Sequence, residues 1–146
     1  MKVVLTMVVT AAVFMIFAGC SSVSGGRSYD VAMSGRPMRV AVLPFSNLSG
    51  FRDADRIIYG IYISELFAAD KFIIEEPGNV RQFLIQERIT SVGELEVDRL
   101  KILGKRLKAD AVITGAVEEF DDGRGGVPVV SVTARMIESG TGRVIW

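Results

Sequence analysis

The chain has 146 residues, of which 49% are hydrophobic, and its 17 basic and 17 acidic side chains give a formal net charge of zero. This composition indicates one domain that can bury a core, and the balanced charge argues against a nucleic-acid-binding protein, which would carry a basic stripe. The sequence has no histidine and a single cysteine, Cys20. It therefore lacks the usual general base of hydrolases, an internal disulfide and a cysteine-based zinc site.

The first twenty residues have the three parts of a secretory signal peptide. Lys2 provides the positive charge, residues 3–17 form an apolar stretch that is short for a membrane span, and small residues follow. Residues 17–20 (Phe-Ala-Gly-Cys) resemble the bacterial lipobox, in which cleavage before the cysteine leaves a residue that carries lipid. We therefore predict a signal peptide over residues 1–19 and a covalent lipid on Cys20. An ordinary cleaved signal peptide with a stray thiol and an uncleaved anchor helix are the alternatives.

The segment after the signal peptide predicts a tethered domain at the outer membrane, facing the periplasm. Residues 20–38 are rich in serine and glycine, which is typical of a flexible tether. Ser21 resembles the residue found after the cysteine in lipoproteins sent to the outer membrane, because the inner-membrane retention signal of that family is typically aspartate at this position. Acyl chains on Cys20 would hold the domain at the bilayer, since each buried CH₂ contributes about 0.8 kcal/mol.

The folded part is predicted to begin with a strand in the middle of a sheet. Residues 39–45 are apolar on both alternating faces, which is typical of a strand covered on two sides. Ser46, Asn47 and Ser49 follow at the carboxyl end of this strand, where open α/β sheets bind ligands. Turn and helix-cap chemistry explains these three residues, so we expect no small-molecule site there.

Helical periodicity and start signals predict three helices and a short strand before residue 110. Asp53 and Asp55 are expected to cap the first helix, and Ser91 with Glu94 forms a capping box that opens the third. The predicted elements are a helix from these aspartates to about Ala69, a strand over 72–75, a helix over 77–88, and a third helix lined by Leu100, Leu103 and Leu107.

From Asp110 onward the hydrophobic period changes to two, which predicts an antiparallel run of three strands. The first covers residues 110–120, the second covers 127–137, and the third begins at 143–146. A Gly-rich loop at 121–126 and a tight turn at 139–142 connect them. We predict that the inner face of the second strand consists of Val130, Val132, Ala134 and Met136.

The loop over residues 121–126 is interpreted as a hairpin turn, because a phosphate-binding loop needs a helix after it and here a strand follows. The carboxylates over 118–122 lack EF-hand spacing, and strand alternation sends Glu118 and Glu119 to opposite faces. We therefore expect no metal and no cofactor besides the lipid on Cys20. Since no nucleophile has an obvious base partner, we also expect no catalytic residue and no enzyme.

The order strand, helix, strand, helix, helix and three strands predicts an α/β fold, with helices packed on a mixed sheet and a C-terminal antiparallel hairpin. Residues 39–50 (RVAVLPFSNLSG), residues 103–115 (LGKRLKADAVITG), and residues 133–137 with 141–142 resemble TolB N-terminal domains and the curli secretion protein CsgG. The resemblance implies one such domain over residues 39–146. The sequence stops at Trp146 within the last expected strand, as a fragment would.

The resemblance, together with the lipobox, implies a non-enzymatic binding or assembly module of the bacterial cell envelope. It also implies an alternative, a CsgG-like subunit of an outer-membrane secretion or curli-type assembly apparatus. The expected partners are the membrane, through the lipid anchor, and envelope proteins. Association with further copies of this chain is an open alternative. Asp110, Gly115 and Gly142 are given structural roles in a turn, a close backbone approach and a positive φ.

Overall fold

The computed structural model describes residues 36–92 and 95–146. The predicted signal peptide, Cys20 and nearly all of the predicted tether lie outside these residues. The described elements, in chain order, are β1 (Met38–Val42), β2 (Ser46–Asn47), α2 (Ala54–Ala69), β3 (Phe72–Ile74), α3 (Pro77–Gln86), α4 (Val97–Leu107), β4 (Ala111–Asp121) and β5 (Val129–Glu138).

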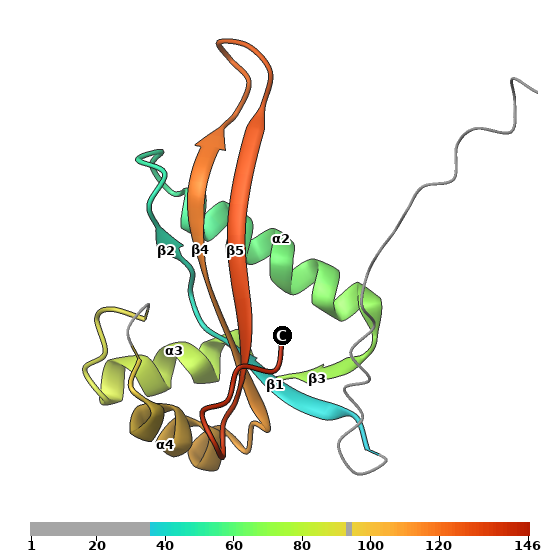
Figure 1. Cartoon of the computed structure of the whole chain (residues 1–146), viewed down its shortest axis with the longest axis vertical. Helices are drawn as coiled ribbons and strands as arrows, with labels where there is room; N and C mark the ends of the chain where they lie inside the picture. The colour runs from blue at the N-terminus through green and yellow to red at the C-terminus, as the bar shows by residue number, and fades with distance from the viewer. Residues whose placement is uncertain (1–35, 93–94) are drawn as a thin grey trace, which may run out of the picture.

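The strands form one mixed sheet, which confirms the predicted fold class. β1 lies between β3 and β4 and runs parallel to both, with Val40 opposite Ile74 on one side and Ala111 on the other. β2 continues along the same edge of β4, also in parallel. β5 is antiparallel and covers the opposite edge of β4 along almost its whole length (Figure 1).

Two hydrophobic clusters, one on each face of the sheet, form the core. Val40 and Val42 pack in the cluster that contains α2, whereas Ala41 and Leu43 pack in the cluster that contains α3 and α4. All four side chains are essentially inaccessible to solvent. β1 is therefore buried on both faces in the middle of the sheet, as the apolar residues on both of its alternating faces predicted.

Two of the predicted helix starts are wrong in detail. Asp53 precedes α2, but its backbone is left-handed, with φ 63°, and its carboxylate makes no capping hydrogen bond. The carboxylate lies 3.6 Å from Arg56 instead. The third helix, α4, begins at Val97 rather than near Ser91, and Glu94 of the predicted capping box lies outside the described residues.

The late start of α4 follows from packing. Val92 and Leu95 pack against the cluster of α3 and α4, so both side chains contact the core before the helix begins at Val97. The leucine stripe holds as predicted, because Leu100 and Leu103 are buried and Leu107 is half-buried. Of the helices in residues 36–92 and 95–146, none has the length and hydrophobicity that crossing a bilayer requires.

Candidate functional site: the β4–β5 hairpin

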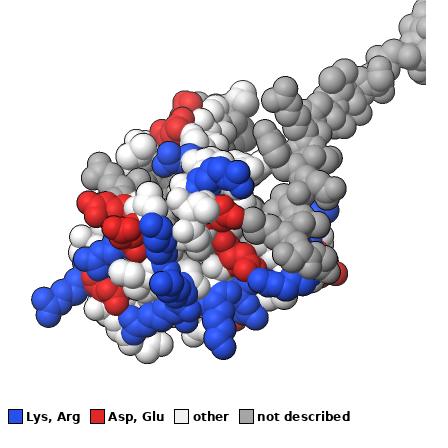
Figure 2. Space-filling model, turned by 60° about the horizontal axis from the view of Figure 1, so that its bottom comes forward, with Lys and Arg blue, Asp and Glu red and all other residues white. Residues whose placement is uncertain are grey.

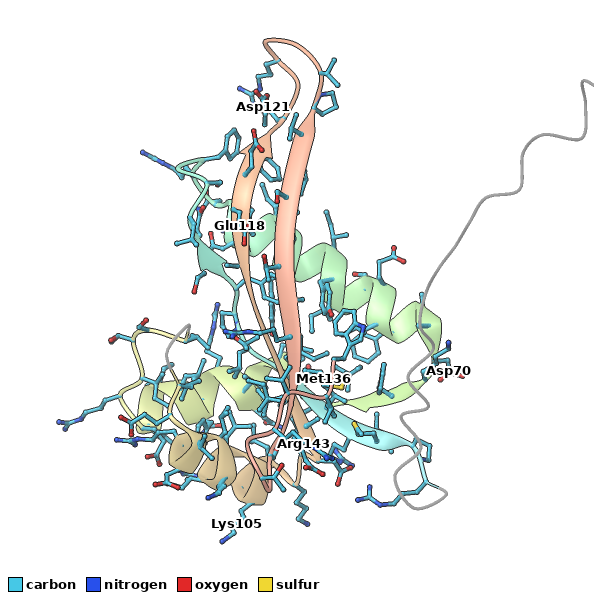
Figure 3. The ribbon with its side chains drawn as sticks, viewed as in Figure 1. Asp70, Lys105, Glu118, Asp121, Met136 and Arg143 are labelled. Atoms are coloured by element: carbon cyan, nitrogen blue, oxygen red, sulfur yellow. The ribbon has the colours of Figure 1, made fainter. Side chains whose placement is uncertain are left out.

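The β4–β5 hairpin projects beyond the rest of the sheet. β1 pairs with β4 only as far as Ile113, and β2 pairs only as far as Val117, whereas the pairing with β5 continues to Asp121. Figure 1 shows the resulting arm, and Figure 3 places Asp121 at its end, far from Lys105. Among the described residues, no strand therefore pairs with the last part of β4 on the side of β1 and β2.

Exposed valines line this projecting arm. Val127 in the loop is 81% exposed, and Val130 and Val132 on β5 are 52% and 38% exposed. These two strand residues were predicted to form a buried inner face with Met136, which is indeed only 3% exposed. The prediction of burial is wrong for Val130 and Val132, because β5 is an edge strand and α2 packs on β2, β3 and β4 instead.

The outer edge of β5 is paired only at its base. Residues 143–146 form a single antiparallel bridge, between Val144 and Ile137, rather than the start of a regular strand as predicted. The Met136 N–H donates to the Trp146 carbonyl at 2.7 Å, and the Ile145 N–H donates to Met136 at 2.8 Å. Among the described residues, no strand pairs with this edge between residues 129 and 135.

Gly115 and Gly142 have the structural roles that the sequence predicted. A Cβ on Gly115 would lie 2.5 Å from the Thr133 carbonyl oxygen, so only glycine permits β4 and β5 to approach here. Gly142 has a φ of 75° in the turn after β5. Both glycines therefore set the geometry of the hairpin and of its base.

The loop at the end of the hairpin is a turn, as predicted. Asp121 accepts a hydrogen bond from the Gly123 N–H at 2.8 Å, and Asp122 pairs with Arg124. The expectation that Glu118 and Glu119 lie on opposite faces is wrong. A β-bulge between Val117 and Glu119 interrupts the alternation, and Glu118 bonds Thr133 on the face that Glu119 shares with Ser131. In the described part of the chain, no three acidic or cysteine side chains gather as a metal ion would require.

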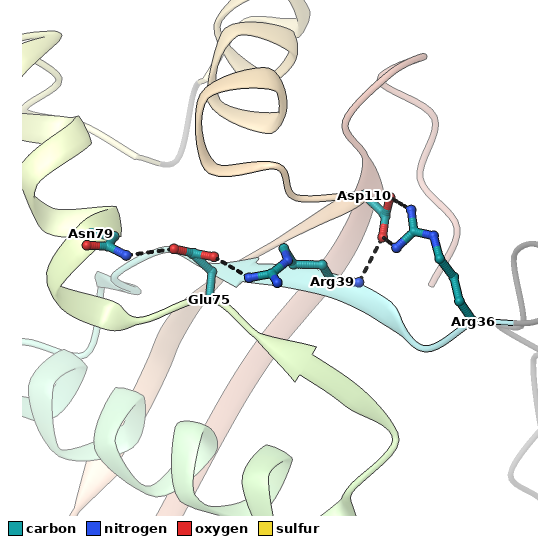
Figure 4. Close-up of polar contacts among 5 residues, drawn as sticks. All are labelled: Arg36, Arg39, Glu75, Asn79 and Asp110. Carbon is teal, nitrogen blue, oxygen red and sulfur yellow. Dashed lines mark hydrogen bonds and ion pairs between the residues drawn. The ribbon is translucent and has the colours of Figure 1, made fainter.

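Five polar residues join the start of β1 to the turn before β4, to the end of β3 and to α3 (Figure 4). Glu75 is only 7% exposed, and its carboxylate accepts hydrogen bonds from Arg39 at 3.0 Å and from Asn79 at 2.8 Å. Asp110 accepts from both guanidinium nitrogens of Arg36, at 3.0 and 2.6 Å, and from the Arg39 N–H at 2.8 Å. The role of Asp110 is thus to fasten the beginning of β1 to the turn between α4 and β4.

Three side chains in these regions have shifted pKa values. Partial burial acts to raise the pKa of Asp110, but hydrogen bonds from Arg36 and Arg39 outweigh it and hold the pKa of this carboxyl below its ordinary value. Burial raises the pKa of Tyr59 and of Tyr62, which pack around Phe45. Both tyrosines belong to the α2 side of the core and not to the hairpin surface.

Hollows in the described part of the chain also lie outside the hairpin. One, of about 550 Å³, is lined by polar side chains that include Arg39, Glu75 and Arg106. The other, of about 390 Å³, lies at the carboxyl end of β1 beside Tyr59. Ser46, Asn47 and Ser49 do not line it; Asn47 instead accepts hydrogen bonds from the Ser49 N–H and hydroxyl, at 3.1 and 2.8 Å, which is the turn chemistry that the sequence predicted.

No protein-family model and no curated protein matches the sequence. Solved structures do match the fold. Lipoprotein GNA1162 from Neisseria meningitidis has a TM-score of 0.63 and 23% identity, over 75% of this chain and 76% of that one. The chain shares its fold with a bacterial lipoprotein.

Two further solved structures share the fold. The LpoB C-terminal domain from Salmonella enterica has a TM-score of 0.58 and 13% identity, over 75% of this chain and 78% of that one. A PelC dodecamer from Paraburkholderia phytofirmans has a TM-score of 0.51 and 24% identity, over 75% of this chain and 67% of that one. The resemblance to CsgG and TolB N-terminal domains stays a prediction.

Proposed function

We propose that this chain is a lipoprotein anchored through Cys20 in the outer membrane, facing the periplasm, and that it acts as a non-enzymatic binding or assembly module of the cell envelope. Its β4–β5 hairpin would contact the protein partner. The observation that carries this proposal is the row of exposed valines on an arm that projects from the sheet.

Two physical features support the hairpin as the contact surface. Clustered exposed apolar side chains mark interaction sites, and the valines at 127, 129, 130 and 132 are all at least 38% exposed. The edge of β5 next to them also presents backbone N–H and carbonyl groups to which a partner strand can bond. A partner that adds a strand here would bury the valines and satisfy these groups together.

The fold likeness to lipoprotein GNA1162 supports the lipobox interpretation of Cys20. Intact mass of the protein extracted from membranes tests it. For the wild-type protein we expect the mass of a chain that begins at Cys20 and carries acyl groups. The Cys20→Ala variant should carry no acyl groups and should be absent from the membrane fraction. A free thiol that reacts with maleimide in the wild-type product would contradict the anchor.

The second candidate is a subunit of an oligomeric secretion or assembly apparatus. The open edge of β5 favours it, because an edge strand can pair with a second copy as readily as with another protein. The same fold occurs in PelC, which crystallised as a dodecamer. Size exclusion of the detergent-extracted protein separates the candidates, since a ring of many copies favours the apparatus and a monomer or dimer favours the module.

Photo-crosslinking in intact cells tests the surface itself. A photoreactive residue at Val130 is expected to give a discrete adduct, whereas the same residue at Ile85, which is 70% exposed on α3, is the matched control and should give none. Val132→Asp should abolish the Val130 adduct. Mass spectrometry of the adduct then identifies either a different envelope protein or a second copy. Equal labelling from both positions would contradict a specific role for the hairpin.

A further inference from the structure

Charge is distributed unevenly along the long axis of the molecule. The α4 end, defined here as residues 99–108, contains five cations and no carboxylate: Arg99, Lys101, Lys105, Arg106 and Lys108. The hairpin tip, residues 118–124, contains four carboxylates and one arginine. Figure 3 shows Lys105 and Asp121 at opposite ends, and Figure 2, which brings the lower end of the molecule forward, shows Lys and Arg gathered there.

Neighbouring carboxylates neutralise only part of the α4 end. Glu87 accepts from Arg99 at 3.1 Å and from Arg106 at 2.8 Å, and Asp98 lies 3.4 Å from Lys101. Glu96 at the N-cap of α4 is a third nearby carboxylate. Five cations thus face three carboxylates, which leaves an excess of two positive charges. All five side chains are exposed, so this excess is available to a ligand outside the fold.

An apolar side chain lies within the same surface. Ile102 is 43% exposed and stands next to Lys101 on the helix. The negative end of the helix dipole accounts for cations in the last turn, Lys105 and Arg106, but not for those in earlier turns. Basic side chains around an exposed apolar one are typical of a helix that lies on an anionic membrane surface.

The chain enters the fold beside this surface. Arg36, the first described residue, binds Asp110, which follows Lys108 by two positions (Figure 4). Fifteen residues lie between Cys20 and Arg36. If these residues form the flexible tether that the sequence predicts, they would span roughly 20–24 Å on average. An anchor at Cys20 would therefore hold the α4 end within reach of the bilayer and raise its effective concentration there.

We propose that the α4 end docks on anionic phospholipid headgroups of the membrane that carries the anchor. The hairpin then points away from the bilayer. This inference rests on the proposed anchor at Cys20. The acidic hairpin tip of a second copy is the other occupant with complementary charge, but Arg124 already pairs with Asp122 there, whereas an anchor at Cys20 would keep the lipid surface constantly within reach of the α4 end.

The test uses the acylated full-length protein, with its mass verified, in vesicles of phosphatidylcholine alone or with 30% phosphatidylglycerol. A fluorophore is attached at Ile102→Cys or, as a comparison, at Val127→Cys, and a quencher is carried on lipid headgroups. We expect strong quenching at position 102 in the phosphatidylglycerol vesicles only, reversed by about 0.5 M NaCl because salt screens these charges. Position 127 should remain unquenched throughout.

Charge reversal assigns the docking to α4. Each basic residue near an anionic surface typically favours binding about fivefold, so Lys101→Glu with Lys105→Glu and Lys108→Glu should lower the docked-to-undocked ratio by about a hundredfold or more. Arg52→Glu with Arg56→Glu and Lys71→Glu changes the net charge equally at other positions and should leave position 102 quenched. If circular dichroism shows that the α4 variant does not fold, the proposal is still tested by the quenching at position 102 in the two lipid mixtures, measured on the protein without the charge-reversing substitutions.

Three outcomes would overturn the proposal. Equal quenching at position 102 in both lipid mixtures, or an equal effect of the two triple variants, would exclude specific docking of α4 on anionic lipid. Protection of position 102 that grows with protein density and disappears on Glu119→Lys would assign the surface to a second copy. A protein without a lipid on Cys20 would give a different result, because it would not remain on phosphatidylcholine vesicles. Binding of its α4 end to phosphatidylglycerol vesicles could still be measured by sedimentation.

Discussion

Gly115→Ala should destabilise the domain, because β4 and β5 approach each other too closely here for a side chain. A Cβ on Gly115 would lie 2.5 Å from the Thr133 carbonyl oxygen and 3.1 Å from the Phe45 ring. The nearer contact is with backbone, so no change of rotamer relieves it, and β5 must shift against β4. Phe45 is itself buried against Tyr59 and Tyr62, which leaves its ring little room to move.

The expected loss of stability is about 2 kcal/mol. Inserting a methyl group into a well-packed site costs about 1–3 kcal/mol, and a clash with backbone belongs at the upper end of that range. Replacing glycine also lowers the conformational entropy of the unfolded chain, which stabilises the folded state by about 0.4–1 kcal/mol and offsets part of this loss. For a domain of roughly 110 residues, a net loss of about 2 kcal/mol lowers the Tm by roughly 8 °C.

Thermal unfolding of the detergent-extracted protein, followed by far-ultraviolet circular dichroism, measures this effect. Gly60→Ala is the matched control, because Gly60 lies on the exposed side of α2 with nothing within 4 Å of its Cβ position. Alanine is a better helix former than glycine by up to about 1 kcal/mol, so this variant should melt higher than wild type. A Gly115→Ala protein that melts at or above the wild-type temperature would refute the close approach of the two strands.

Two further predictions concern the polar cluster at the start of β1. Because the pKa of Asp110 is lowered in the folded state, its charge stabilises the fold above the ordinary carboxyl pKa, and this contribution is lost as pH falls through the lowered value. Urea unfolding should therefore give Asp110→Asn a lower free energy of unfolding than wild type at pH 7. This difference in free energy should become smaller toward pH 3. A difference that stays the same at both pH values would contradict the ion pair. Arg39→Met leaves the Glu75 carboxylate buried without its cation and should cost about 2–3 kcal/mol, less than for a fully buried pair because Arg39 is partly exposed. Adding Glu75→Leu should recover part of that loss, and a double variant less stable than Arg39→Met alone would contradict the assignment.

The core of the sheet could be predicted because a strand that is buried on both faces has apolar residues at consecutive positions. Residues 40–43 are apolar at every position, and such a strand has to be covered on both faces, as Val40 and Ala41 show on opposite sides. The start of α4 could not be predicted in the same way. Ser91 and Glu94 have the spacing of a capping box, but Val92 and Leu95 pack into the core, and this tertiary contact places the helix start at Val97.

The exposure of the hairpin valines could not be predicted from the sequence for a different reason. Alternation correctly placed Val130 and Val132 on the same face as Met136, but period-two patterns do not state how far a covering helix extends. Only the arrangement of α2 over β2, β3 and β4 shows that these valines on the edge strand stay exposed. The bulge after Val117 likewise breaks the alternation that assigned Glu118 and Glu119 to opposite faces.

One strand connects the two surfaces to which we assign function. β4 pairs with the buried β1 over residues 111–113, directly after the turn that Asp110 fastens to Arg36, and continues to Asp121 at the hairpin tip. The bulge after Val117 is its one irregularity, and β5 accompanies it throughout. A partner bound to the valines would therefore be held at a fixed orientation relative to the α4 end. If that end lies on the membrane, the fold sets both the height and the direction in which the hairpin is presented.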